Sequence, residues 1–223
     1  HYRSAYRILR ALGEVESECR TAMHAQMDIS KLRRRTNGIL ARELRGEGSG
    51  SGHVDRMFLG GVTHRGEICR FDTVEALCPR IYALIDSAGL GNEMLESIVQ
   101  AAQEKQFDVI ACPNPDRPQE LHHVLIPEKG LAFITTNARI PYEGKPCRRL
   151  RLDAMAEETL TRAQKAKLRF TRRVEASLLD EAVAALSDAK KAHDALESVY
   201  HPCVDFNGVT ALAEREINRI LKQ

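Results

Sequence analysis

The sequence lacks three features that would each point to a class of protein. Its six cysteines include no CxxC pair, which argues against a disulfide framework or a zinc site and fits reduced thiols. No apolar run is long enough to span a membrane, and the first segment lacks the order of a signal peptide. The formal net charge is only +2, so the overall field does not favour nucleic acid or an anionic membrane as a partner. We therefore expect a cytoplasmic protein without a membrane partner.

Aromatic residues are also scarce, at 5% of the chain, and this bears on nucleic-acid binding. Basic clusters occur at 31–35, 148–151 and 165–173, and acidic residues are interleaved nearby. Proteins that bind single-stranded nucleic acid combine a basic groove with aromatic side chains on which bases stack. We interpret the clusters as solvated helix faces, with an RNA-binding surface as the alternative.

What the chain does contain is helical periodicity at both ends. Apolar residues recur at three- and four-residue steps over 4–25, and a second helix follows a break at Asp28. We predict a helical hairpin over 1–46, as the tail of a preceding repeat, and a flexible linker of glycine and serine over 47–54. Residues 154–223 show the same pattern and predict a C-terminal helical hairpin.

The two predicted hairpins match each other in sequence. An offset of 177 residues carries Asp28 onto Asp205. Without a gap it also superposes apolar positions, namely Leu9 on Leu186, Leu12 on Ala189, Cys19 on Leu196, Ile29 on Phe206, Leu32 on Val209, Leu40 on Ile217 and Leu44 on Leu221. We interpret each hairpin as the end of a repeat made of an α/β domain followed by its helices, so that the first would belong to a domain before His1. Coincidence between two amphipathic helices is the alternative.

Residues 55–153 show a different pattern, with short apolar runs and one helix. The helix is predicted from Gly91 to Lys105. The runs that predict strands are Met57–Leu59, Ile81–Ile85, Val109–Cys112, Val124–Ile126 and Leu131–Thr135. Strands buried on both faces and alternating with a helix are typical of a parallel α/β sheet.

One segment of this α/β region has the order of a phosphate-binding loop. The strand that ends at Ile85 leads into a glycine-bearing turn and then a helix. Compared with GxxxxGK[ST], Asp86 replaces the first glycine, Asn92 the phosphate lysine and Glu93 the magnesium-binding hydroxyl. A like charge about 4 Å from a phosphate costs about 4 kcal/mol at an effective dielectric of 20, so Asp86 and Glu93 would repel an anion. We predict a vestigial phosphate loop at Ser87, Ala88, Gly89, Leu90, Gly91, Asn92 and Glu93.

The second magnesium element of such a site, an apolar strand ending in Asp, is also incomplete. The strand that begins at Leu131 has Thr135 where the carboxylate would stand. Two independent losses therefore indicate that this region does not turn over nucleotide. An ordinary strand–turn–helix that never bound phosphate is the alternative, because a pair of glycines is a weak signal.

Several motifs resemble the second half of a tandem bacterial P-loop ATPase family with nucleotide-kinase-like domains. They are Gly61-Val62-Thr63-His64-Arg65-Gly66, Phe71-Asp72-Thr73, the loop above, Gln106-Phe107-Asp108-Val109, Cys112-Pro113-Asn114-Pro115-Asp116, Val124-Leu125-Ile126-Pro127-Glu128, Gly130-Leu131-Ala132 and Tyr200-His201-Pro202-Cys203-Val204-Asp205-Phe206. The resemblance covers residues 55 to 223 and implies a P-loop NTPase-like parallel sheet. It also implies ATP and magnesium as ligands of members with an intact loop, which this chain lacks.

The remaining candidates are weaker. His122 and His123, with Cys112 and His64, could be imagined as metal ligands, but adjacent histidines in an extended segment point to opposite faces. We therefore predict no metal site, no catalytic residue and no cofactor in this chain.

Two functions follow from these patterns. The first is a non-catalytic, regulatory or structural half of a tandem ATP-binding protein, whose partner is an upstream P-loop domain of the same protein or another copy in a homo-oligomer. The alternative is a nucleotide- or phosphate-binding ATPase or kinase-like enzyme that a partner domain completes.

Overall fold

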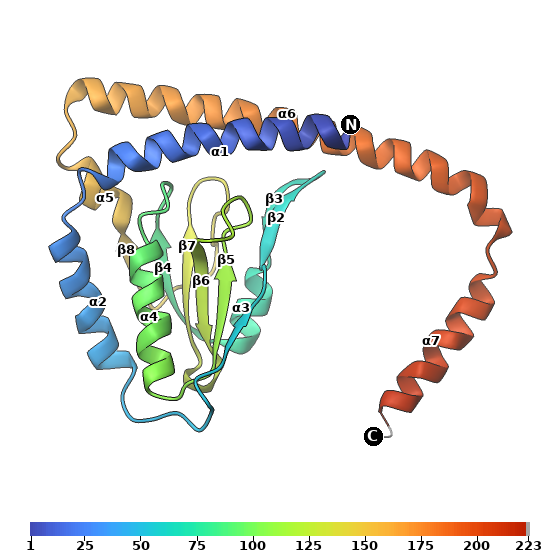
Figure 1. Cartoon of the computed structure of the whole chain (residues 1–223), viewed down its shortest axis with the longest axis horizontal. Coiled ribbons are helices and arrows are strands. Elements are labelled where there is room, and N and C mark those ends of the chain that lie inside the picture. Colours follow the sequence, from blue (N-terminus) through green and yellow to red (C-terminus); the bar gives the residue numbers. More distant parts are fainter. Residues whose placement is uncertain (222–223) are drawn as a thin grey trace.

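The structure is a computed structural model and describes residues 1–221 (Figure 1). Its helices are α1 (Tyr2–His24), α2 (Ile29–Glu43), α3 (Phe71–Leu77), α4 (Asn92–Glu104), α5 (Leu152–Glu157), α6 (Arg162–Tyr200) and α7 (Phe206–Ile220), with short 3-10 turns η1 (Pro127–Lys129) and η2 (His201–Cys203). Its strands are β1 (Val54–Arg56), β2 (Gly60–Thr63), β3 (Gly66–Cys69), β4 (Arg80–Ile85), β5 (Val109–Pro113), β6 (Leu121–Ile126), β7 (Leu131–Thr136) and β8 (Arg148–Arg151).

Six of the strands form one sheet in the order β1-β5-β6-β7-β4-β8. The prediction of a mixed α/β fold with helices around a central sheet is confirmed. The prediction of an all-parallel sheet is wrong at β6, which runs antiparallel to both β5 and β7. The physical reason is the length of its connections. The turn η1 and Gly130, at φ 55°, join β6 to β7, and such a short link can connect only antiparallel neighbours.

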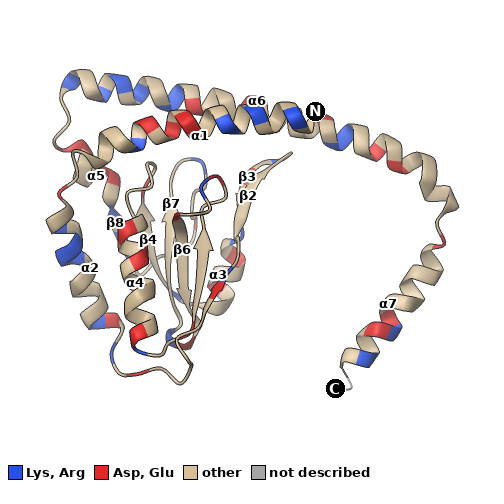
Figure 2. Ribbon diagram, viewed as in Figure 1, with Lys and Arg blue, Asp and Glu red and all other residues tan. Residues whose placement is uncertain are grey.

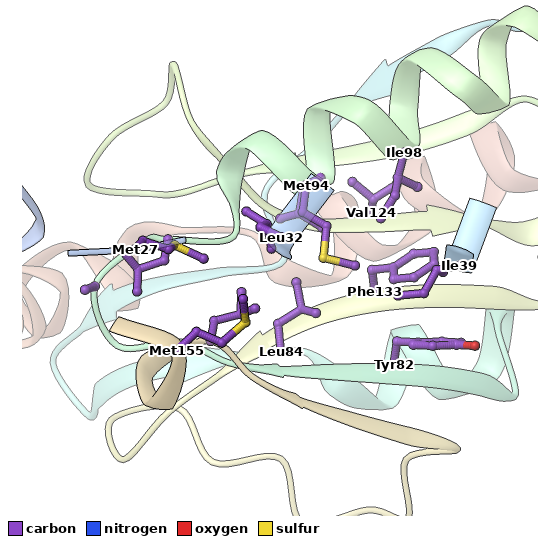
Figure 3. Packing of buried hydrophobic residues seen from close by; sticks show 14 of the residues in the cluster. Met27, Leu32, Ile39, Tyr82, Leu84, Met94, Ile98, Val124, Phe133 and Met155 are labelled. Atoms are coloured by element: carbon purple, nitrogen blue, oxygen red, sulfur yellow. The ribbon is translucent and has the colours of Figure 1, made fainter. Parts of the chain in front are cut away.

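Helices cover both faces of this sheet. On one face α2 and α4 lie side by side over the central strands. Leu32 of α2 lies beside Met94 of α4, and Ile39 of α2 lies beside the ring of Phe133 (Figure 3). On the other face Val74 of α3 is part of a second, smaller cluster. Strand β7 is buried along its whole length, which its continuous apolar run predicts.

The first predicted strand is misplaced. Residues 57–59 are not a strand, and the side chains of Met57 and Phe58 are 45% and 57% exposed. The polar segment β1 at 54–56 pairs with β5 instead. An edge strand with one neighbour does not need side chains that are apolar on both faces.

Neither predicted hairpin closes on itself. Helix α1 lies antiparallel along α6, whereas α2 turns away from α1 and packs against α4 (Figure 1). At the other end α7 turns away from α6 in the same manner (Figure 1). The break at Asp28 was predicted, but the partner of each helix was not, because an apolar stripe does not specify which element covers it.

The glycine-rich segment 47–54 is held to the sheet and is not a free linker. The backbone N–H groups of Ser51 and His53 donate to the Asp108 carboxylate at 3.0 and 2.8 Å. That of Ser49 donates to Glu128 at 3.0 Å. The backbone also runs so close to the domain that a Cβ on Gly48 would stand 2.4 Å from the carbonyl oxygen of Gln106. The glycines therefore serve close approach as well as flexibility.

Candidate functional site

The predicted loop lies at the carboxyl end of β4, where ligands of open α/β sheets usually bind. The order strand, turn, helix is as predicted, with Gly91 as the N-cap of α4. Gly89 has φ 71°, which a residue with a side chain adopts at a cost. Residues Ser87, Ala88, Gly89, Leu90, Gly91, Asn92 and Glu93 thus form one continuous turn into the helix.

The side chain of Asp86 fills the inside of this turn. Its carboxylate accepts hydrogen bonds from the backbone N–H groups of Ala88 at 3.1 Å, Leu90 at 3.0 Å and Gly91 at 2.7 Å. The residue is 2% exposed. These inward N–H groups are the donors that a phosphate loop offers to its ligand. In this chain they already hold an anion that belongs to the protein.

Burial raises the pKa of Asp86, and the hydrogen bonds from the loop act against that rise. The sequence predicted that Asp86 would flank the position of a phosphate and repel it. The structure corrects this: the carboxylate lies inside the loop itself. The same carboxylate accepts from the backbone N–H of Gly91, the N-cap of α4.

Another N–H group, at the start of the loop, also has a partner within the protein. The backbone N–H of Ser87 donates to both carboxylate oxygens of Asp153, at 3.0 and 3.2 Å. Burial raises the pKa of Asp153 to about 6, and the neighbouring Asp86 adds to the rise. The Ser87 hydroxyl accepts a hydrogen bond from Arg172 of α6 at 2.9 Å. Sequence reasoning missed Asp153, since it lies in the first turn of α5, far along the chain.

Asn92 and Glu93 have structural partners as well. The Asn92 side-chain oxygen accepts from the backbone N–H of Leu121 at 2.7 Å and so ties α4 to β6. Glu93 accepts from the guanidinium of Arg33 at 2.7 Å, which links α4 to α2. The two positions that the sequence comparison set against the phosphate lysine and the magnesium ligand therefore make contacts within the protein.

Thr135 lies beside the loop, as the magnesium-strand comparison requires. It is opposite Leu84 in the pairing of β4 with β7. Its backbone N–H donates to Nδ1 of His123 at 3.1 Å. His123 is buried, and burial lowers its pKa well below the usual value. It therefore serves as a neutral acceptor in the core.

An ion-pair cluster covers the open side of the loop. A Cβ on Gly89 would stand 3.2 Å from the guanidinium of Arg117 and 3.5 Å from the Arg20 side chain. Arg20 comes from α1 and pairs with Glu120, which also pairs with Arg117 at 2.9 Å. The cavity left between the loop and this cluster is about 40 Å³. That volume holds a few water molecules, not a triphosphate.

Glu16 of α1 anchors the same cluster from above. Its carboxylate pairs with Arg117 at 2.8 Å and with Arg139, and Arg139 also pairs with Glu67 at 2.6 Å. Burial raises the pKa of Glu67 and of Asp116, which lies in the same group. The pair formed by α1 and α6 thus crosses the carboxyl ends of the strands and closes over the loop (Figures 1 and 2).

A larger cavity of about 490 Å³ lies next to the loop, toward β8. Its lining includes apolar side chains such as Ile85 and Tyr142 and the basic side chains of Arg139, Arg149 and Arg172. It also includes Asp153 and Glu175, and burial raises the pKa of both carboxyls. This cavity is the place in the described chain where a small ligand would find room.

The predicted metal candidates are not brought together around an open position. His122 lines the small cavity, and burial lowers its pKa to about 4, whereas His123 points into the core. Within residues 1–221 no group of three or more histidine, cysteine or acidic side chains is arranged to hold a metal ion. Burial raises the pKa of Cys69 and Cys112 to about 12, so these thiols are poor nucleophiles. In the same range, no helix combines the length and apolarity needed to cross a membrane.

Comparison of the chain with protein families, with curated proteins and with solved structures gave no match. The functional argument therefore rests on the geometry of the loop and of the helices that cover it.

Proposed function

We propose that this chain is a non-catalytic, regulatory or structural half of a two-unit P-loop protein, located in the cytoplasm. Its loop at 86–93 is a structural turn that keeps the shape of a phosphate loop without the ligand. The partner is a second α/β unit of the P-loop kind, upstream in the same protein, and any nucleotide chemistry belongs to that unit. A homo-oligomer is the other form that such a pairing could take.

One observation carries the proposal: the Asp86 carboxylate accepts three loop N–H groups at 2.7 to 3.1 Å. A phosphate would have to displace a buried carboxylate and then face it at close range. It would also have to enter a cavity of about 40 Å³ beneath Arg20 and Glu120. Either demand opposes binding, because a like charge about 4 Å away costs about 4 kcal/mol at an effective dielectric of 20.

Isothermal titration of the chain with magnesium and ATP tests this proposal. We expect no heat of binding at ligand concentrations up to about 1 mM, which corresponds to less than about 4 kcal/mol of binding free energy. Micromolar binding that survives Asn92→Ala and is lost on substitution of Gly91 would contradict the proposal.

A restored loop provides the positive arm of the experiment. The triple variant Asp86→Gly, Asn92→Lys and Glu93→Thr rebuilds the full GxxxxGK[ST] pattern. If the scaffold descends from a phosphate-binding loop, we expect this variant to bind ATP more tightly than the native chain does. A matched control carries Asp86→Gly alone, which empties the loop without supplying the lysine.

The cavity of about 490 Å³ supports the second candidate, a nucleotide- or phosphate-binding enzyme that a partner unit completes. Three arginines in its lining suit an anionic ligand. The titration separates the two candidates. Binding that depends on Arg149 and Arg172 but not on Gly91 would favour a ligand in this cavity over a silent loop.

A further inference from the structure

The C-terminal arm of the molecule has an apolar face that no described residue covers. We define the arm as α7 together with the last three turns of α6, from 190 to 221. No residue of α7 is buried. The large apolar side chains that are more than one-third exposed are Leu196, Val199, Tyr200, Val204, Phe206, Val209, Leu212, Ile217, Ile220 and Leu221. Isolated exposed apolar residues are ordinary, but a continuous face of this size marks an interaction site.

The α7 helix is the structural equivalent of α2. Each helix has 15 residues, and the offset of 177 carries the bounds of one onto the other, Ile29 to Phe206 and Glu43 to Ile220. Each begins with an aspartate N-cap in nearly the same conformation, φ −75° and ψ 88° against φ −79° and ψ 84°. Each aspartate accepts from the backbone N–H three residues on, at 2.8 and 3.0 Å. The sequence match is therefore also a match of geometry.

The offset of 177 also applies to the long helices, which pack together, and it carries a residue near the start of α1 onto a residue in the middle of α6. Glu18 of α1 pairs with Lys167 of α6 at 2.8 Å. In an antiparallel pair, a step toward the start of one helix matches an equal step toward the end of the other. Thirteen residues from Glu18 and from Lys167, these steps reach Ala5 in α1 and position 180 in α6, which is about half a turn from Ala182. The offset of 177 carries Ala5 onto Ala182, and both are fully buried. The pair of helices thus has an approximate two-fold axis near these two alanines.

This axis relates α2, whose apolar face is covered, to α7, whose apolar face is not covered by any described residue. The α2 helix buries Leu32, Thr36 and Ile39 against α4 and the sheet. The same positions of α7 are Val209, Ala213 and Glu216, and the flanking positions Ile29, Leu40 and Leu44 become Phe206, Ile217 and Leu221. Five of these six positions in α7 are apolar and exposed, and the sixth, Glu216, is half-buried. Helix α7 thus repeats the face of α2 without the α/β unit that covers it.

The apolar pattern of α6 also continues into the arm. Ala182 and Ala189 of α6 are buried and lie seven residues apart, and the next step of seven reaches Leu196, which is 60% exposed. A seam with this spacing packs along a second helix. The covered part of the seam ends, but its apolar pattern does not.

We propose that the arm is the docking surface for a second α/β unit of the same kind as residues 54–156. In this interface α7 covers the helix of that unit that corresponds to α4, as α2 covers α4 here. The inference rests on the two-unit arrangement proposed above and names its contact surface. A second copy of the chain is a poorer occupant, since in each copy α4 is already covered by its own α2.

A helix graft within the full chain tests whether α7 fits an α4 surface. The 15 residues of α7 replace the 15 residues of α2, with Asp28 kept as the N-cap. We expect the graft to unfold cooperatively, with a thermal midpoint within about 10 °C of the native chain, because the main apolar contacts are kept. The matched control is the same graft in which the two residues that originate from Val209 and Ile217 are replaced by Asp. We expect the thermal midpoint of this control to be about 8 °C lower than that of the first graft.

Two positions of the graft need a second variant. Glu216 and Ile220 would take the places of Ile39, which is buried, and Glu43, which pairs with Arg80. If the first graft does not fold, a graft that retains Ile39 and Glu43 decides the question. Failure of both grafts overturns the docking surface, whereas the proposed function is overturned by ATP binding and not by this result.

The occupant is tested on the native chain. Val209→Asp with Ile217→Asp should leave the thermal midpoint and the sedimentation coefficient unchanged, because both side chains are already exposed, at 57% and 55%. A concentration-dependent dimer of the native chain that this double variant abolishes would mean that a second copy is the occupant and would overturn our assignment.

Discussion

The Oδ2 atom of Asp86, which opens the loop, lies 2.7 Å from the backbone N–H of Gly91, which closes it. This bond, with those to Ala88 and Leu90, makes the loop self-contained. The inward N–H groups of an anion-binding turn can be satisfied in two ways, by an external anionic ligand or by a carboxylate of the protein itself. This chain has the second, so the N–H groups of Ala88, Leu90 and Gly91 are already satisfied.

Removal of the Asp86 carboxylate should therefore destabilise the fold. Asp86→Ala leaves three buried N–H groups without an acceptor, and we expect the free energy of unfolding to fall by about 3 kcal/mol or more. Urea denaturation followed by circular dichroism measures this loss. The control Asp188→Ala, on the exposed side of α6, should change it by less than about 0.5 kcal/mol. Equal effects of the two substitutions would show that the carboxylate does not hold the loop.

The pKa of Asp153 makes stability depend on pH. Its folded-state pKa, about 6, is raised above the usual 3.8, so the folded protein binds more protons than the unfolded chain between these values. Stability should therefore rise as pH falls from 7 toward 4, by up to about 3 kcal/mol from this group. Denaturant titrations at pH 7, 6 and 5 measure the slope.

Asp153→Asn is the control for that slope, because the amide oxygen can still accept from Ser87 but does not titrate. Burial lowers the pKa of His122 and His123, so these groups make stability fall as pH falls and oppose the contribution of Asp153. We therefore expect the change in stability from pH 7 to pH 5 to be less favourable in this variant than in the native chain. Burial also raises the pKa of Asp116, Glu67 and Glu175, so part of the slope should remain. A slope that is identical in both proteins would rule out Asp153 as its source.

Arg139 should be important for the attachment of α1. It pairs with Glu16 and Glu67, and both carboxylates are largely buried. Arg139→Met leaves these two charges without their shared partner, and we expect a loss of about 3 kcal/mol or more in the free energy of unfolding. Arg169→Met, on an exposed part of α6, is the matched control. A double-mutant cycle with Glu16→Gln would then measure how much of the loss belongs to the contact with α1.

Two glycines should respond to alanine in opposite directions. Gly48→Ala would place a Cβ 2.4 Å from a backbone oxygen, so we expect a loss of about 2 kcal/mol in stability. Gly13→Ala, in the middle of α1 with nothing within 4 Å, should gain about 1 kcal/mol. Thermal melts of the two variants test this together. If Gly48→Ala is neutral, the segment 47–54 is not held against the sheet.

The sequence by itself determined the local elements of this protein. Helical periodicity predicted α1, α2, α4 and the long helix α6, and the break at Asp28 predicted where α2 begins. The buried strands β4 and β7 follow from continuous apolar runs. The sequence also shows directly that Asp86, Asn92, Glu93 and Thr135 differ from the residues of an intact phosphate-binding site, because such a loop is a local motif whose chemistry depends on fixed spacing.

Only the tertiary structure decided which of these elements meet. It placed the Asp86 carboxylate inside its own loop, brought Asp153 to Ser87 across 66 residues, and laid α1 over the site. In the folded chain α2 packs against α4 and not against α1. The equivalent helix α7 has no such partner among the described residues. The physical reason is that an apolar stripe or a buried charge specifies that it needs a partner, while the identity of that partner depends on contacts between residues distant in the chain.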